Sequence, residues 1–126
     1  LVAHLEGGVA GYAYAVPYRA RPAYCYTVED SVYVAPWARQ RGVGLALLRA
    51  LLSHCEIWGA RQMVAIVGDP AANNASIRLH EKAGFRSVGT LVGVGRKFDS
   101  WLDSLMLQRP LGHGISTSPG DPRVPA

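Results

Sequence analysis

A strand, a glycine-rich turn and a leucine-rich helix follow one another in residues 27–58, and this succession constrains the fold more than any other part of the chain. The segment TVEDSVYVAP has the composition of a strand and ends at Pro36. Leucines then recur at helical spacing over residues 44–58, with polar residues on the opposite side, and Gly59 provides a helix stop. We therefore expect a helix that packs one side on a sheet.

The remaining segments alternate between strand and helix patterns. The nearly all-apolar run QMVAIVG is typical of a strand covered on both faces. The expected strands cover residues 1–5, 9–17, 27–36, 62–68, 85–95 and 101–111, and the expected helices cover residues 44–58 and 75–83. The order β-β-β-α-β-α-β-β predicts an α/β layered domain with a mixed sheet, without an internal repeat or a second domain.

Composition excludes several classes of protein. The chain has 126 residues, is 49% hydrophobic and carries a net charge of +4, which suits one domain with a core. Its basic residues form no run, which argues against a nucleic-acid partner. The chain has no signal-peptide pattern and no apolar run near the roughly 18 residues that span a bilayer, so we expect a cytoplasmic protein without a membrane partner. Cys25 and Cys55 lack CxxC spacing and are expected to be buried, reduced thiols, with no metal site.

The end of the chain differs in composition from the rest. The segment GHGISTSPGDPRVPA is rich in Gly, Pro and Ser and poor in large apolar side chains. Such a segment cannot bury enough surface to offset its ordering entropy. We therefore expect a folded domain over residues 1–111 and a disordered tail over residues 112–126.

The turn RQRGVG has the properties of an anion site. Gly42 and Gly44 carry no Cβ atom that would keep a ligand away from the backbone, and the first N–H groups of the helix attract negative charge. Arg39 and Arg41 add side chains that reach phosphate oxygens. A nucleotide P-loop needs Gly-Lys-Ser/Thr and a dinucleotide fingerprint needs a third glycine, and both are absent. The alternative is an ordinary glycine turn with solvated arginines.

Two segments resemble signatures of the GNAT acetyltransferase superfamily. RQRGVG matches its Arg/Gln-x-x-Gly-x-Gly motif after a strand, and NNASIRLHEKAGF matches a second signature, in which an Asn precedes a helix that ends in Gly-Phe. LHEKAGF and KFDSWLD resemble, more narrowly, the phosphinothricin and methionine sulfone/sulfoximine N-acetyltransferase branch. The similarity extends over residues 1–111. It implies a mixed, mostly antiparallel central sheet with helices on both faces.

This resemblance also implies an activity. The expected co-substrate is acetyl-CoA, and the acetyl group would pass to the α-amine of a small amino-acid analogue by direct attack in a ternary complex, within a homodimer. Relatives carry a strand and two helices ahead of the first hairpin, so we expect a domain that lacks these three elements. Two alternatives stay open. One is a GNAT enzyme for another amine, and the other is a remnant that binds acetyl-CoA or dimerises without turnover.

The family's cofactor residues map onto three parts of the chain. The main chain of Val32, Tyr33 and Val34 is expected to bind the pantetheine arm and to stabilise the oxyanion. Asn73 matches the Asn that hydrogen-bonds this arm, and a helix N-cap is its alternative role. The residues expected to cradle the diphosphate are Gln40, Arg41, Gly42, Val43, Gly44 and Leu45.

Two residues are candidates for acid–base catalysis. An α-amino group has a pKa near ~8 and must lose a proton before it attacks, and Glu29 is our candidate base. Its neighbour Asp30 is expected to point to the other side of the strand. His80 occupies the position where many GNAT enzymes carry a Tyr that protonates the departing thiolate. The alternatives are a solvated carboxylate for Glu29 and a core histidine for His80.

The loop PYRARPAY follows the second expected strand and is the candidate substrate-binding segment. An arginine fork suits the carboxylate of an amino-acid substrate. We expect Arg21, Arg19 and Tyr18 to bind the substrate, with surface ion pairs as the alternative for the two arginines.

Overall fold

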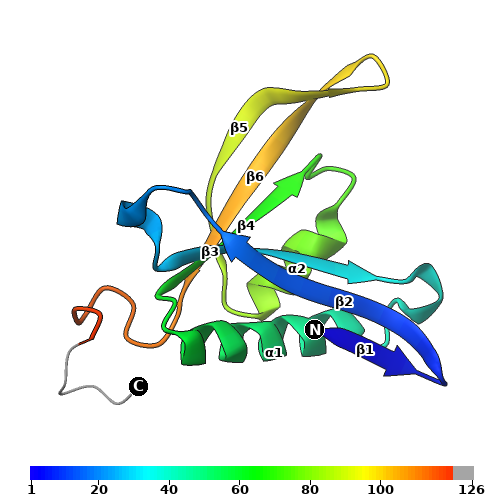
Figure 1. The fold of residues 1–126 in the computed structure, drawn as a ribbon. Coiled ribbons are helices and arrows are strands. Elements are labelled where there is room, and N and C mark those ends of the chain that lie inside the picture. Colours follow the sequence, from blue (N-terminus) through cyan, green and yellow to red (C-terminus); the bar gives the residue numbers. More distant parts are fainter. Residues whose placement is uncertain (121–126) are drawn as a thin grey trace.

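The structure of the protein, a computed structural model, describes residues 1–120 and consists of one six-stranded sheet and two α-helices (Figure 1). Two short 3₁₀ turns flank the third strand. The strands are β1 (Val2–Leu5), β2 (Gly8–Pro17), β3 (Thr27–Val34), β4 (Gln62–Gly68), β5 (Arg86–Lys97) and β6 (Ser100–Pro110), and the helices are α1 (Val43–Trp58) and α2 (Asn74–Lys82).

The sheet is mixed and mostly antiparallel, as expected. Its strand order is β1-β2-β3-β4-β6-β5, and β3–β4 is the one parallel pair in it. A parallel pair needs a crossover connection, and α1 provides it. At the β5 edge of the sheet, β5 and β6 form a long hairpin that projects away from the helices (Figure 1).

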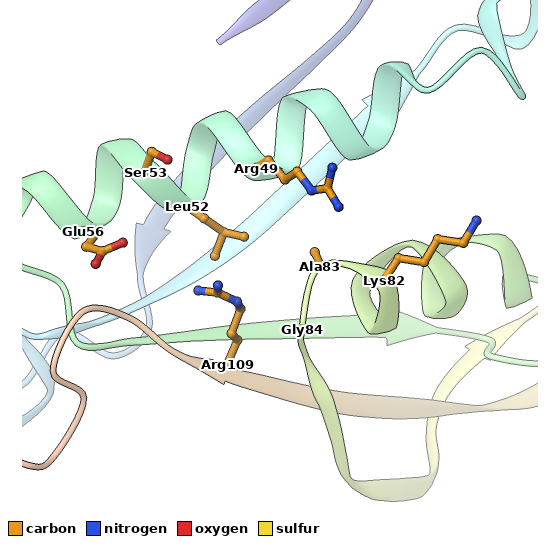
Figure 2. A pocket seen from close by; sticks show the side chains of 8 residues that line it. All are labelled: Arg49, Leu52, Ser53, Glu56, Lys82, Ala83, Gly84 and Arg109. Atoms are coloured by element: carbon orange, nitrogen blue, oxygen red, sulfur yellow. The ribbon is translucent and has the colours of Figure 1, made fainter.

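Both described helices cover the same face of the sheet, which we call the helix face. Its side chains include Ala13, Met63 and Leu107, and all three are buried. In Figure 2, α1 and α2 lie next to each other on this side of the sheet; α1 packs on β2 and β3, and α2 packs on β4. The opposite face, which we call the open face, carries Tyr12 and Tyr33, whose rings stack 5.2 Å apart and are nearly half exposed.

The expected placement of helices on both faces is therefore not found in residues 1–120. The pattern of an amphipathic helix shows that it has a buried side, but it does not specify which face of a sheet that side covers. The predicted helix bounds are confirmed to within one residue, because the leucine spacing and Gly59 determine them directly.

The core lies between α1 and the sheet. Two rows of side chains along α1 are buried, Leu47 with Leu51 and Leu48 with Leu52, and we call them the leucine rows. Gly59 ends the helix with a φ of 100°, in the left-handed region. Leu48, Met63, Leu107 and Leu111 are the largest fully buried side chains. Burial of one such side chain stabilises the fold by about 1.5–3 kcal/mol. These contacts fix α1, and with it the turn that precedes α1, relative to β3.

The described part of the C-terminal segment differs from expectation. Residues 112–120 were expected to be disordered, but they form hydrogen-bonded turns on the domain. The Arg61 guanidinium donates to the carbonyl oxygens of Gly114 at 2.8 Å, Thr117 at 3.1 Å and Ser118 at 3.3 Å. The expectation of disorder rested on composition, which does not show that the Arg61 side chain holds these carbonyl groups. The rest of the expected tail, residues 121–126, lies outside the described residues.

Two further expectations concern the cysteines and the membrane. Cys55 is buried as expected, whereas Cys25 is exposed because it follows a short 3₁₀ turn in the loop after β2. Neither helix of residues 1–120 has the length and apolar character needed to cross a bilayer.

Candidate active site

The strands β3 and β4 separate soon after they begin to pair. Their parallel ladder contains three residue pairs, Thr27–Gln62, Val28–Met63 and Glu29–Val64. From Asp30 onward β3 continues to pair with β2, while β4 continues to pair with β6. The two strands therefore leave an opening in the middle of the sheet, beyond Glu29, with unpaired main-chain groups along its edges.

The direction of the main-chain groups along β3 follows from three hydrogen bonds. Ala35 N–H donates to Ala10 at 2.7 Å and Tyr18 N–H donates to the Thr27 carbonyl at 3.1 Å, so odd-numbered residues face β2. The Tyr26 carbonyl accepts from Arg61 N–H at 2.8 Å, on the β4 side. Because these groups alternate along a strand, residues 30, 32 and 34 direct theirs toward β4.

Because of this alternation, the main-chain groups of Val32, Tyr33 and Val34, the three residues expected to bind the pantetheine arm, do not all point the same way. The main-chain groups of Val32 and Val34 point into the opening, and they lie within reach of a ligand there. The main-chain groups of Tyr33 are directed at β2, where they pair with Tyr12. Tyr33 can therefore contribute through its exposed side chain but not through its backbone.

The start of α1 has free hydrogen-bond donors. The first main-chain hydrogen bond of the helix runs from Ala46 N–H to the carbonyl oxygen of Gly42, the N-cap residue, at 3.1 Å. No side chain caps the helix and no acidic residue lies in its first turn. The N–H groups of Val43, Gly44 and Leu45 consequently have no helical acceptor. Together with the helix dipole, these free donors favour negative charge at the turn where the sequence predicts an anion site.

The two glycines of the turn have different roles. Gly42 is exposed with a φ of 79°, a left-handed conformation that favours glycine, and a Cβ there would meet no atom within 4 Å. A Cβ on Gly44 would lie 3.3 Å from side-chain atoms of both Leu79 and Val34. Gly44 therefore allows α1 to pack closely on α2 and β3, rather than clearing space for a ligand as we expected.

The arginines beside this turn are on the surface. Arg41 Nη2 donates to Glu6 Oε1 at 3.0 Å, and both side chains are exposed. Arg39 is also exposed, and Gln40 has a φ of 61°. An exposed ion pair of this kind contributes little to stability, so Arg41 is free to exchange Glu6 for another anion.

Asn73 lies across the opening from Val34, on the β4 side, just before α2. Its Nδ2 group donates to the carbonyl oxygens of Gly68 at 2.8 Å and Asp69 at 3.1 Å, at the end of β4. It occupies the N-cap position, but its side chain makes no capping hydrogen bond, and Asn74 is already the first helical residue. Its amide is thus fixed by β4, with the Oδ1 atom left as an acceptor.

Glu29 lies at the last paired position before the opening. It is half-buried, and it pairs with Val16 of β2 and Val64 of β4. The β2–β3 register is regular over this stretch, so the Glu29 side chain lies on the open face together with those of Ser31 and Tyr33. The carboxylate is therefore placed on the side opposite to the helices.

Asp30 lies on the helix face and forms a buried ion pair with His80. The distance between Asp30 Oδ2 and His80 Nε2 is 2.7 Å, and the two side chains are 3% and 5% exposed. The other ring nitrogen, Nδ1, lies 2.7 Å from the Ser76 carbonyl. Both ring nitrogens are thus occupied by protein acceptors. A direct donor role for His80 requires that it release one of these bonds.

The environment of His80 favours its charged form. Burial by itself would lower the pKa of His80, but the hydrogen bond and negative charge of Asp30, together with the Ser76 carbonyl, outweigh it and raise the pKa above 6.5. The same pair affects α1, because burial and the charge of Asp30 raise the pKa of Cys55. The sequence analysis did not find this pair. The two residues are 50 positions apart, and only the side to which Asp30 points was predictable.

The expected substrate loop lies at the same end of the sheet as Glu29. Tyr18 N–H bonds to the carbonyl of Thr27, two residues before Glu29. The Arg19 guanidinium stacks on the Tyr18 ring at 4.4 Å, and the Tyr18 and Tyr24 rings meet edge to face at 6.2 Å. Arg21 is exposed and precedes a short 3₁₀ turn. The loop thus has aromatic packing and exposed cationic groups.

A separate groove of about 470 Å³ lies between α1, α2 and the end of β6 (Figure 2). It contains none of the site residues expected from the sequence. It combines basic and acidic side chains, and its lining residues are Arg49, Leu52, Ser53, Glu56, Lys82, Ala83, Gly84 and Arg109.

Comparison with known proteins identifies the family. The chain belongs to the acetyltransferase (GNAT) family, whose sequence profile matches residues 1–85. It is 50% identical over 119 residues to a phosphinothricin N-acetyltransferase of Alcaligenes faecalis, which covers 94% of this chain and 60% of the relative. It is 40% identical to an L-methionine sulfoximine/L-methionine sulfone acetyltransferase of Salmonella typhimurium, over 88% of this chain and 64% of the relative.

A solved structure supports the same relationship. The phosphinothricin acetyltransferase of Sinorhizobium meliloti, crystallised in complex with AcCoA, has a TM-score of 0.89 and 46% identity to this chain. The alignment covers 96% of this chain and 65% of that one. The chain therefore has the GNAT fold, and it spans about 60% of the length of the first curated relative.

Proposed function

We propose that this protein transfers the acetyl group of acetyl-CoA to the α-amine of a small amino-acid analogue of the phosphinothricin or methionine sulfone type. One observation carries the proposal: the uncapped start of α1 and the opening between β3 and β4 lie together on the helix face, and Glu29 lies on the other face at the edge of the same opening. The named substrates of the relatives support this substrate class.

The chain offers acetyl-CoA three groups of contacts. The free N–H groups of Val43, Gly44 and Leu45 suit the diphosphate, with Arg41 as a mobile cation beside them. The main-chain groups of Val32 and Val34 suit the amides of the pantetheine arm, as does the Asn73 Oδ1 atom on the β4 side of the opening. Acetyl-CoA supplies a thioester, which is an activated acyl group.

Glu29 is the proposed general base. The substrate amine loses a proton to the carboxylate, directly or through water, and its nitrogen attacks the thioester carbonyl. A C–N bond forms and the C–S bond breaks, and coenzyme A leaves as a thiolate that takes up the second proton, which the nitrogen loses as the amide forms. A β3 N–H group that faces the opening, such as that of Val32, stabilises the negative oxygen of the intermediate.

Direct transfer fits the placement of the nucleophilic side chains. The Cys25 thiol makes no hydrogen bond to a base within residues 1–120 that would activate it, and Cys55 is buried with a raised pKa, which disfavours its reactive thiolate form. Neither thiol is suited to carry an acetyl group. The amine is therefore proposed to attack acetyl-CoA within a ternary complex.

The substrate carboxylate is proposed to bind the loop after β2. Arg21 and Arg19 are exposed there, and Tyr18 packs beneath Arg19. These cationic groups disfavour polycationic amines as substrates. If Arg21→Ala leaves the KM for the amino-acid substrate unchanged, this assignment is wrong.

A homodimer in the cytoplasm, without nucleic acid or membrane as partner, is part of the same proposal and rests on the resemblance to this branch of the family. Light scattering during gel filtration measures the mass in solution. A mass of one chain, about 13.5 kDa, would contradict the dimer.

The proposal is tested by following thiol release from acetyl-CoA with phosphinothricin and with methionine sulfone. Their N-acetylated forms serve as controls, because they lack a free amine. Thiol release that depends on the free amine is the expected result. Binding of acetyl-CoA by calorimetry, without thiol release with either amine, would instead identify a cofactor-binding remnant.

A further inference from the structure

We infer that Asp30 is a positioning residue, which holds the imidazolium of His80 and thereby ties α2 to β3 where β3 leaves β4. The kinetic part of the inference rests on the proposed function, whereas the ion pair itself does not.

The position of the pair in the fold gives it this role. Asp30 is the first residue of β3 beyond its ladder with β4, so from here on β3 is paired with β2 alone and no strand pairing joins the two sides of the opening. His80 lies in the last turn of α2, the helix that follows β4. The 2.7 Å contact between them therefore joins the two sides of the opening on the helix face.

Hydrogen-bond chemistry indicates the charge of the pair. The Ser76 carbonyl is an acceptor only, so the His80 Nδ1 atom must donate to it. Asp30 as a carboxylate is also an acceptor only, so Nε2 must donate as well. A histidine that donates from both nitrogens is an imidazolium. The raised pKa of His80 agrees with this arrangement.

Within residues 1–120, no other charged side chain faces the Asp30–His80 pair. From α1, Cys55 faces it as a neutral thiol with a raised pKa. From β4, the side chains on the helix face are Met63 and Ala65, which are apolar. Beyond α2, the Phe85 ring contacts the imidazole edge to face at 4.9 Å. On α2 itself, the charged neighbours Glu81 and Lys82 are exposed.

The consequence concerns the backbone at the opening. The main-chain groups of residues 30 and 32 point at β4, so a fixed Asp30 side chain fixes the donors that face the thioester. Loss of the charge on Asp30 would loosen α2 from β3 and change the width of the opening. We therefore expect Asp30 to affect the affinity for acetyl-CoA more than the chemical step.

The test compares Asp30→Asn with wild type and with Asp99→Asn. Asn keeps the size of the side chain and an oxygen acceptor, and it removes only the charge. Asp99 is fully exposed in the β5–β6 turn, so Asp99→Asn removes the same charge far from the pair. NMR titration of the His80 ring should show a midpoint above 6.5 in wild type and Asp99→Asn, and a lower midpoint in Asp30→Asn.

Kinetics and binding then separate positioning from a purely structural role. Asp30→Asn should raise the Kd of acetyl-CoA by about tenfold and change kcat less than that. In wild type this affinity should fall as the pH rises through the midpoint of His80, and Asp30→Asn should lose that dependence. Urea unfolding of each variant identifies any variant that fails to fold.

Two results would overturn the inference. The first is a His80 midpoint that is the same in Asp30→Asn and wild type. The second is an unchanged acetyl-CoA affinity in a folded Asp30→Asn protein whose His80 midpoint has fallen. If the wild-type chain binds acetyl-CoA but transfers no acetyl group, the proposed function fails, while the titration and the binding data still decide the role of Asp30.

Discussion

Glu29 and Asp30 are neighbours in the sequence, and their side chains serve opposite faces of β3. Glu29 points to the open face, where we place the amine, and Asp30 points to the helix face, where it holds His80. Two carboxylates of similar chemistry thus take different roles because a strand alternates its side chains. At the scale of single residues, the consequences of this division are measurable.

Replacement of Glu29 by Gln should lower kcat for thiol release by at least about a hundredfold, because the amide cannot accept the amine proton. The Kd of acetyl-CoA should stay unchanged, since the side chain lies on the face opposite to the helices. Steady-state kinetics and calorimetry measure the two quantities. Glu81→Gln, at an exposed position of α2, is the matched control. Full retention of kcat in Glu29→Gln would remove Glu29 from the mechanism.

The His80–Asp30 pair predicts a specific dependence of stability on pH. The folded state raises the pKa of His80 above 6.5, so the stabilisation is complete below that value and is lost as the pH rises through the folded pKa. The free energy of unfolding should therefore fall as the pH rises above 6.5 and through the folded pKa of His80. Urea unfolding at about pH 6 and about pH 8.5 measures this loss, and His80→Asn should show a smaller one. An equal loss in both proteins would assign it to other groups.

At the scale of elements, α1 does most to define the site. Its leucine rows fix it on the sheet, and Gly44 brings its first turn close to α2 and β3. Its free N–H groups then lie at the end of the opening where Val34 leaves β3. Because the N-cap residue is Gly42 and not Ser, Thr, Asp or Asn, no side-chain oxygen occupies these donors.

Substitutions at Gly42 should move stability and affinity in opposite directions. Asp and Asn both tolerate the positive φ of this position, and they differ by one charge. Asp should stabilise the helix relative to Asn by about 0.3–1 kcal/mol, because its charge complements the helix dipole. The same charge should weaken acetyl-CoA binding by about tenfold relative to Asn, because it repels the diphosphate. Thermal unfolding and calorimetry compare Gly42→Asp with Gly42→Asn. Equal affinities of the two variants for acetyl-CoA would place the diphosphate elsewhere.

Local patterns predicted most of the elements, whereas contacts between distant segments were beyond their reach. The bounds of α1 and the side to which Asp30 points depend on spacing along one segment, and both were predictable. The direction of the Tyr33 backbone also follows from strand alternation and was open to prediction. The Asp30–His80 pair and the packing of Gly44 against Leu79 require the tertiary arrangement. The turns held by Arg61 require it too.

At the scale of the whole molecule, the sheet separates two kinds of surface. The helix face carries the start of α1 and the side chain of Asn73, and the open face carries Glu29 and exposed tyrosines. The opening between β3 and β4 connects the two surfaces. A cofactor that enters from the helices can thereby present its acetyl group to an amine on the other face. The Sinorhizobium meliloti phosphinothricin acetyltransferase, crystallised with AcCoA, has the same fold, with a TM-score of 0.89 to this chain.

The most direct measurement of this account is a two-dimensional amide NMR titration of the chain with acetyl-CoA. The largest shifts should fall on the amides of residues 42–45 and on those of Val32 and Val34, with a smaller shift at Tyr33, whose N–H bonds to β2. Shifts that gather instead around the groove of Arg49, Lys82 and Arg109, or no shifts at saturating acetyl-CoA, would contradict the proposed cofactor site.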